Sequence, residues 1–144
     1  MAAPVYADTS FLVSLYIQDA NSVRAVADAP RLLPLFFTPL AEHELRNAIR
    51  LCVFRRQITS GQRERALDDI ASDKTAGVLH VGPLDWPTAL KHAEVLGRKH
   101  TEGLGARGMD ILHVASALAL KADRFVTFDD RQRELARLAR LDVL

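Results

Sequence analysis

Residues 109–129 read MDILHVASALALKADRFVTFD, a helix pattern followed by a strand pattern that ends in an acid. The helical part is the most apolar in the chain, because Val114, Ala117 and Leu118 follow Asp110 at spacings that share one helix face. The run Phe125–Phe128 lacks clean polar alternation, as expected of a strand buried on both faces. This stretch therefore predicts a buried helix that leads into a strand of a covered sheet.

The same alternation of strands and helices extends through the whole chain. The other short β-like runs are Val5–Ala7, Leu35–Phe37, Val78–Val81 and Asp142–Leu144. Helical patterns are found at Thr9–Ile17, Ser22–Ala29, Pro39–Arg56, Gly61–Ala76, Trp86–Lys99, Met109–Lys121 and Asp130–Arg140. The pattern predicts one domain over residues 1–144, an α/β/α sandwich with a mainly parallel sheet of four or five strands. The glycine-rich stretch Thr101–Gly108 is predicted to be a mobile loop.

Composition excludes several classes of protein. With 144 residues, 49% of them hydrophobic and 26% charged, the chain has the make-up of one ordinary globular domain. No apolar run reaches the roughly 20 residues that cross a bilayer, and signal-peptide features are missing. The single Cys52 cannot form an internal disulfide, which favours a reducing cytoplasm, and its helical context predicts core packing rather than nucleophilic chemistry.

Acidic residues follow the predicted strands at positions that would bring them together. Asp8 comes directly after the first strand run and Asp129 directly after the fourth, and the carboxyl ends of parallel strands meet at one edge of a sheet. Glu44 lies early in the helix after the second strand, and Asp110 begins the most apolar helix. An acid on a buried face needs a partner, so these four residues are candidates for one site.

Each of these acids also has a purely structural interpretation. Asp8 and Asp129 could cap the helices that follow them, and Asp110 could complement a helix dipole. Periodicity does not separate Glu44 from Glu42, which borders the same apolar stripe from the other side. His113 shares a helix face with Asp110 and could hydrogen-bond within the site. Its residue type favours a packed core histidine instead.

Four carboxylates in one pocket must either protonate or bind a cation. No lysine is adjacent to any of them, and no Cys or His has zinc-ligand spacing, so Mg²⁺ or Mn²⁺ is the predicted cofactor, as one ion or two. Such ions activate water and stabilise charge at phosphorus. Sequestering four of the 18 acids would leave 14 against 19 basic residues, an excess of about +5 that suits a phosphate-bearing partner.

Four segments resemble, in order and spacing, the acidic motifs of PIN domains. They are Tyr6–Ser10, Thr38–Ala48, Met109–Leu118 and Phe125–Asp129, and together they span almost the whole chain. The resemblance selects Glu44 over Glu42 and implies Asp8, Glu44, Asp110 and Asp129 as metal-binding and catalytic acids. It also implies that Thr9, Ser10 and Thr127 support them. Asp130 beside Asp129 leaves two choices for the fourth acid.

A compact single domain of this kind resembles the VapC-like toxins of type II toxin–antitoxin pairs. The resemblance implies a cytoplasmic metal-dependent endoribonuclease with an RNA substrate, a cognate antitoxin and a homodimeric state, and no membrane partner. The apolar segment Phe11–Ile17 is a candidate for the antitoxin groove or the dimer face.

Two other functions are compatible with the sequence. One is a non-catalytic PIN-like module that binds RNA or a partner. The other is a doubly wound domain whose acids only cap helices, with or without a bound nucleotide or phosphate group, although no glycine-rich phosphate loop is present. Four separated acids favour the enzyme, because a phosphate-binding surface gains nothing from buried negative charge.

Overall fold

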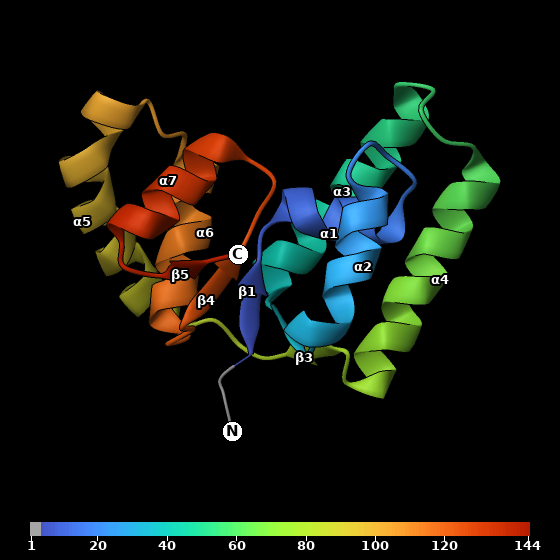
Figure 1. Ribbon diagram of the computed structural model, residues 1–144, viewed down its shortest axis with the longest axis horizontal. Coiled ribbons are helices and arrows are strands. Elements are labelled where there is room, and N and C mark those ends of the chain that lie inside the picture. Colours follow the sequence, from blue (N-terminus) through green and yellow to red (C-terminus); the bar gives the residue numbers. More distant parts are fainter. Residues whose placement is uncertain (1–3) are drawn as a thin grey trace.

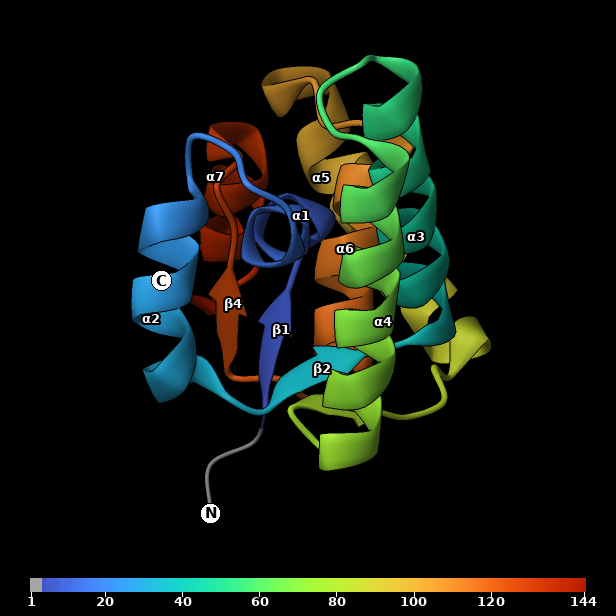
Figure 2. The ribbon, with the colours of Figure 1, turned by 90° about the vertical axis from the view of Figure 1, so that its right-hand side faces the viewer.

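The computed structural model describes residues 4–144, and its centre is a parallel five-stranded sheet (Figure 1). The strands are β1 (Val5–Ala7), β2 (Leu35–Phe37), β3 (Leu79–Val81), β4 (Arg124–Val126) and β5 (Asp142–Val143). They lie in the order β3-β2-β1-β4-β5, and all four pairings are parallel. Figure 2 shows β1 beside β4, both running in the same direction. The predicted α/β class and parallel sheet are confirmed.

Helices connect the strands and cover both faces of the sheet. They are α1 (Thr9–Tyr16), α2 (Ser22–Leu32), α3 (Pro39–Phe54), α4 (Ser60–Ala76), α5 (Trp86–Leu104), α6 (Gly108–Ala119) and α7 (Asp130–Leu138). In Figure 1, α1 to α4 lie on one side of the strands and α5 to α7 on the other. Within residues 4–144, no helix combines the length and the apolar character needed to cross a membrane.

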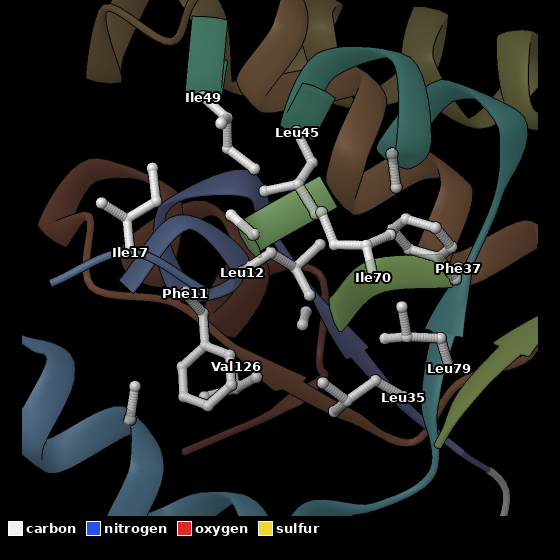
Figure 3. Packing of buried hydrophobic residues seen from close by; sticks show 14 of the residues in the cluster. Phe11, Leu12, Ile17, Leu35, Phe37, Leu45, Ile49, Ile70, Leu79 and Val126 are labelled. Carbon is white, nitrogen blue, oxygen red and sulfur yellow. The ribbon is translucent and has the colours of Figure 1, made fainter. Parts of the chain in front are cut away.

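The alternation of side chains along β1 divides the core into two clusters. Val5 and Ala7 belong to the cluster that packs under α1 to α4, whereas Tyr6 belongs to the cluster with α5 to α7. Figure 3 shows the first cluster, where Phe11 and Leu12 of α1 meet side chains from α3, α4 and the strands. Burial on both faces explains why the strand runs lack polar alternation.

The structure corrects the prediction for residues 101–108. Helix α5 continues to Leu104, so most of the predicted mobile loop is helical. Gly105 ends the helix in the left-handed conformation, at φ 68°, and its N–H donates to the Thr101 carbonyl at 2.8 Å. Gly103 does not break the helix, because one glycine within a helix costs only about 1 kcal/mol. Only residues 105–107 separate α5 from α6.

The structure also accounts for much of the apolar segment Phe11–Ile17. Phe11 and Leu12 are completely buried in the core, and Ile17 is buried as well. These three side chains therefore pack within the core and do not form a free docking face. Val13 and Tyr16 remain only partly buried.

Candidate active site

All four predicted acids line one pocket at the carboxyl end of the sheet. Asp8 directly follows β1, Asp129 follows β4, Glu44 lies in the second turn of α3, and Asp110 is the third residue of α6. The pocket has a volume of about 550 Å³, and its other lining residues are Thr9, Ser10, Arg107, Gly108, Met109, His113 and Gln132. The strand order explains this convergence, because β1 is adjacent to both β2 and β4.

Asp8 is the most deeply buried of these acids, with 2% of its surface exposed. Its Oδ1 accepts hydrogen bonds from the Ser10 hydroxyl at 2.7 Å and from the Phe11 N–H at 3.1 Å, and its Oδ2 accepts one from the Thr127 hydroxyl at 2.5 Å. Burial raises the pKa of Asp8, although these hydrogen bonds and His113 act in the opposite direction. Ionisation of Asp8 is therefore unfavourable unless a cation is near.

Glu44 is held by two donors on one oxygen. Its Oε1 accepts from the Thr9 hydroxyl and from Nε2 of His113, the latter at 2.7 Å. Burial would raise the pKa of Glu44, but the hydrogen bonds and positive charge supplied mainly by His113 outweigh it, so that pKa lies below its usual value. Glu44 is therefore a carboxylate at neutral pH.

Glu42 lies on the same helix but outside the pocket. Its carboxylate accepts from Arg46 at 2.8 Å and from Lys74 of α4 at 2.9 Å, and it does not line the pocket. The geometry thus distinguishes two acids that helical periodicity left equivalent, and it agrees with the choice of Glu44.

Asp110 and Asp129 share a cationic neighbour, Arg107. The Asp110 Oδ2 accepts from the Arg107 backbone N–H at 3.2 Å and from its Nε at 3.1 Å. The Nη2 of Arg107 is 3.7 Å from Oδ2 of Asp129. Sequence reasoning considered neighbouring lysines and missed this arginine. The signal was present, because Arg107 is three residues before Asp110 at the start of the same helix.

The capping interpretation of the acids is correct as well. Asp8 caps α1, and Asp129 caps α7 by accepting from the Gln132 N–H at 2.8 Å. Each cap occupies only part of a carboxylate. The capping N–H groups bond to Oδ1 of Asp8 and to Oδ1 of Asp129, so that Oδ2 of each acid takes no part in the cap. Capping a helix and binding a ligand are therefore compatible roles for these side chains.

The three predicted supporting hydroxyls all contact the acids. Thr9 donates to Glu44, whereas Ser10 and Thr127 donate to Asp8. Thr127 also accepts the N–H of Asp129 at 2.9 Å, so that it joins the ends of β1 and β4.

Asp130, the alternative fourth acid, points away from the pocket. Its side chain is 97% exposed and pairs with Arg133 at 2.9 Å. The geometry favours Asp129 as the fourth acid.

His113 was assigned to core packing by residue type, and it is indeed 2% exposed. It also lies in the site, because Nε2 bonds to Glu44 and Nδ1 lies 2.7 Å from the hydroxyl of Tyr6. The sequence signal was its position one helical turn after Asp110. Its partner Glu44, however, is 69 residues away in the chain.

The chemistry of this pocket fits a hard divalent cation. Carboxylates with supporting hydroxyls are the oxygen ligands that Mg²⁺ and Mn²⁺ prefer. In the part of the chain that is described, however, no three His, Cys, Asp or Glu side chains stand close enough together to hold one ion. Arg107 contacts two of the acids instead. A divalent ion at Asp110 and Asp129 would therefore compete with Arg107 for their carboxylates.

Comparison with known proteins gives a family and a set of structural neighbours. Residues 5–138 match the family model of the PIN domain. No curated protein sequence matches the chain.

Three solved structures share the fold at low sequence identity. FitAcB from Neisseria gonorrhoeae has a TM-score of 0.68 at 16% identity and covers 97% of this chain and 96% of its own. VapC20 of Mycobacterium tuberculosis, described as a toxin that cleaves the sarcin-ricin loop, has a TM-score of 0.65 at 18% identity, with coverages of 89% and 92%. VapBC2 from Rickettsia felis, bound to a promoter DNA fragment, has a TM-score of 0.65 at 17% identity, with coverages of 99% and 98%.

Proposed function

The chain belongs to the PIN domain family, and on that premise we propose that it is a metal-dependent endoribonuclease that hydrolyses RNA phosphodiester bonds. The observation that carries the proposal is the convergence of four acids from four separate elements on one pocket. Asp8 and Asp110 are both buried there, at 2% and 6% exposure. Buried carboxylates that line one pocket are costly without a cation. Hydrolysis at phosphorus is a reaction that bound divalent ions promote.

Asp8, Glu44, Asp110 and Asp129 would hold Mg²⁺ or Mn²⁺. The bound ion would supply an activated water and neutralise negative charge at the phosphate. The protein's own residues prepare the ligands. Ser10 and Thr127 orient Asp8 at the end of β1, while Thr9 restricts Glu44 of α3. Arg107, once displaced from the acids, is placed at the rim to contact a phosphate oxygen.

The toxin role, an antitoxin partner and a homodimeric assembly belong to the same proposal. They are supported by the resemblance to VapC-like proteins and by structural neighbours named as a toxin that cleaves the sarcin-ricin loop and as VapBC2. A structured RNA loop is therefore the first substrate to test.

Purified protein, freed of any inhibitor, is expected to cleave a structured RNA in Mg²⁺ or Mn²⁺ and to stop when EDTA is added. Asp8→Ala should abolish cleavage and leave RNA affinity similar or improved, because it removes negative charge from a phosphate-facing pocket. If Asp8→Ala cuts RNA as fast as the parent protein, the proposed mechanism is wrong.

A second function has one observation in its favour. Arg107 bonds to Asp110 and lies close to Asp129, so the acids as they stand do not form a metal site. A PIN-fold module that binds RNA or a partner without cutting it would have this arrangement permanently. Such a module would bind the test RNA with an affinity that does not depend on Mn²⁺, and it would give no cleavage product.

A further inference from the structure

We infer that His113, held in place by Tyr6, is a positioning residue that fixes Glu44 so that one carboxylate oxygen remains available to the pocket. This inference rests on the proposed function, because it requires that Glu44 binds a metal ion or a water molecule in the pocket. It goes beyond it in naming two residues outside the set of acids and hydroxyls.

The imidazole of His113 is held from the sheet through Tyr6. Its Nδ1 lies 2.7 Å from the Tyr6 hydroxyl, and the two rings meet edge to face with centroids 5.8 Å apart. Tyr6 is itself stacked on Phe125 with centroids 5.3 Å apart. Since Tyr6 belongs to β1 and Phe125 to β4, the position of the imidazole is set by two adjacent strands of the sheet.

The direction of the bond to Glu44 follows from the carboxylate. An ionised carboxylate only accepts hydrogen bonds, so Nε2 of His113 must carry the hydrogen and donate it to Oε1. The Thr9 hydroxyl donates to the same Oε1. Two donors on one oxygen fix the orientation of the carboxylate and leave Oε2 without a protein donor among residues 4–144.

A histidine used for packing alone would not need these contacts. Burying a glutamate side chain of this length restricts its rotamers, and 26% of the Glu44 side chain is exposed, so it could turn toward solvent. Without the His113 bond, Thr9 would be the one remaining donor to the Glu44 carboxylate among residues 4–144. Removing the imidazole would also leave the fully buried Tyr6 hydroxyl without this partner.

The test uses three variants and measures Mn²⁺ binding directly, by calorimetry or by electron paramagnetic resonance. His113→Leu fills the buried position with an apolar side chain and removes both hydrogen bonds. Its Mn²⁺ affinity should fall by about 10- to 100-fold, the range typical when a group that orients a metal ligand is lost. His113→Gln can still donate to Glu44, so it should recover part of that loss. Tyr6→Phe keeps the ring and removes only the hydroxyl, so it should weaken binding less than His113→Leu.

Leu96→Ala is the control for general loss of packing. Leu96 is 5% exposed, belongs to the same core cluster as Tyr6 and has no polar group to contribute. It should lower the melting temperature and leave Mn²⁺ affinity unchanged. RNA kinetics add a second readout, since His113→Leu should lower kcat more than it changes KM.

The contacts of His113 with Glu44 and Tyr6 exist without metal, and nitrogen-15 NMR of the imidazole can follow them separately. In the metal-free protein, Glu44→Gln and Tyr6→Phe should each shift the His113 ring signals, whereas Glu42→Gln should not. Parent-level Mn²⁺ affinity in His113→Leu, or ring signals unmoved by Glu44→Gln, would overturn the positioning role. Failure of the parent protein to bind Mn²⁺ while the ring signals respond as expected would instead refute the proposed function.

Discussion

Arg107 and Asp110 are joined by two hydrogen bonds to the same oxygen, one from the backbone N–H at 3.2 Å and one from Nε at 3.1 Å. The backbone bond caps α6 and would persist if the guanidinium left. The side-chain bond, together with the 3.7 Å approach to Asp129, makes Arg107 a counter-ion for two acids of the pocket. A divalent ion at these acids must therefore compete with Arg107.

Arg107→Gln is expected to raise the affinity for Mn²⁺ in the absence of RNA, because it removes the competing charge. The Arg107 side chain is 68% exposed, so its ion pairs are weak and the gain should be about twofold to fivefold. Calorimetry of the metal-free protein measures this directly. Arg24→Gln is a matched control, since Arg24 is 69% exposed and pairs with Asp28 away from the pocket. Equal affinities in parent protein and Arg107→Gln would show that no competition occurs.

Asp110→Asn should abolish Mn²⁺ binding and leave the metal-free melting temperature unchanged or slightly higher. The substitution relieves repulsion among the acids but weakens the bond from Arg107, and these two effects oppose each other. Differential scanning fluorimetry with and without Mn²⁺ gives both quantities. A large fall in melting temperature with metal affinity intact would mean that Asp110 serves only the N-terminus of α6.

Asp129→Asn and Asp130→Asn separate the two adjacent candidates for the fourth acid. Asp129 lines the pocket, whereas the side chain of Asp130 is 97% exposed. RNA cleavage and Mn²⁺ affinity should fall only in Asp129→Asn. The Asn at position 129 can still cap α7, so its melting temperature should change little. Loss of cleavage in Asp130→Asn alone would reverse the assignment.

Glu44→Gln and Glu42→Gln make the same chemical change two residues apart on α3. Glu44→Gln should reduce RNA cleavage by more than the roughly 10- to 100-fold seen when only a supporting group is lost. Glu42→Gln should keep full activity. Burial opposes ionisation of Glu42, but Lys74 and Arg46 hold its pKa below the usual value, so its stabilising effect is present at neutral pH and is lost as the pH falls. At neutral pH this variant should lose about 1 kcal/mol of unfolding free energy.

Asp8 should lower the unfolding free energy of the metal-free protein as the pH rises, which is opposite to the effect of Glu42. Burial raises its folded-state pKa above the unfolded value near 3.9. Its contribution is therefore full below that unfolded value and is lost as the pH rises through the raised pKa. The difference in unfolding free energy between the parent protein and Asp8→Asn, measured by urea titration across this range, should shrink or change sign as the pH rises. Saturating Mg²⁺ should remove the trend, and a pH-independent difference would contradict the raised pKa.

Local sequence was sufficient for the fold class and for several acids that line the pocket. The runs Val5–Ala7 and Leu35–Phe37 form strands with the predicted bounds. Asp8 and Asp129 follow their strands as expected, since the position of a residue after a strand is a local property of the chain. Helix ends were less predictable. The glycines at 103 and 105 suggested a loop, yet hydrogen bonds along α5 carry the helix to Leu104.

The tertiary structure alone decided which side chains meet in the pocket. Helical periodicity placed Glu42 and Glu44 on the border of one stripe, and the packing of α4 against α3 gave Glu42 its partner Lys74. The contact between Glu44 and His113 joins residues 69 positions apart, and the bond between Tyr6 and His113 joins residues 107 positions apart. Such contacts depend on the strand order β3-β2-β1-β4-β5. Local residue patterns report which face of an element is buried, and only the packed sheet determines what that face meets.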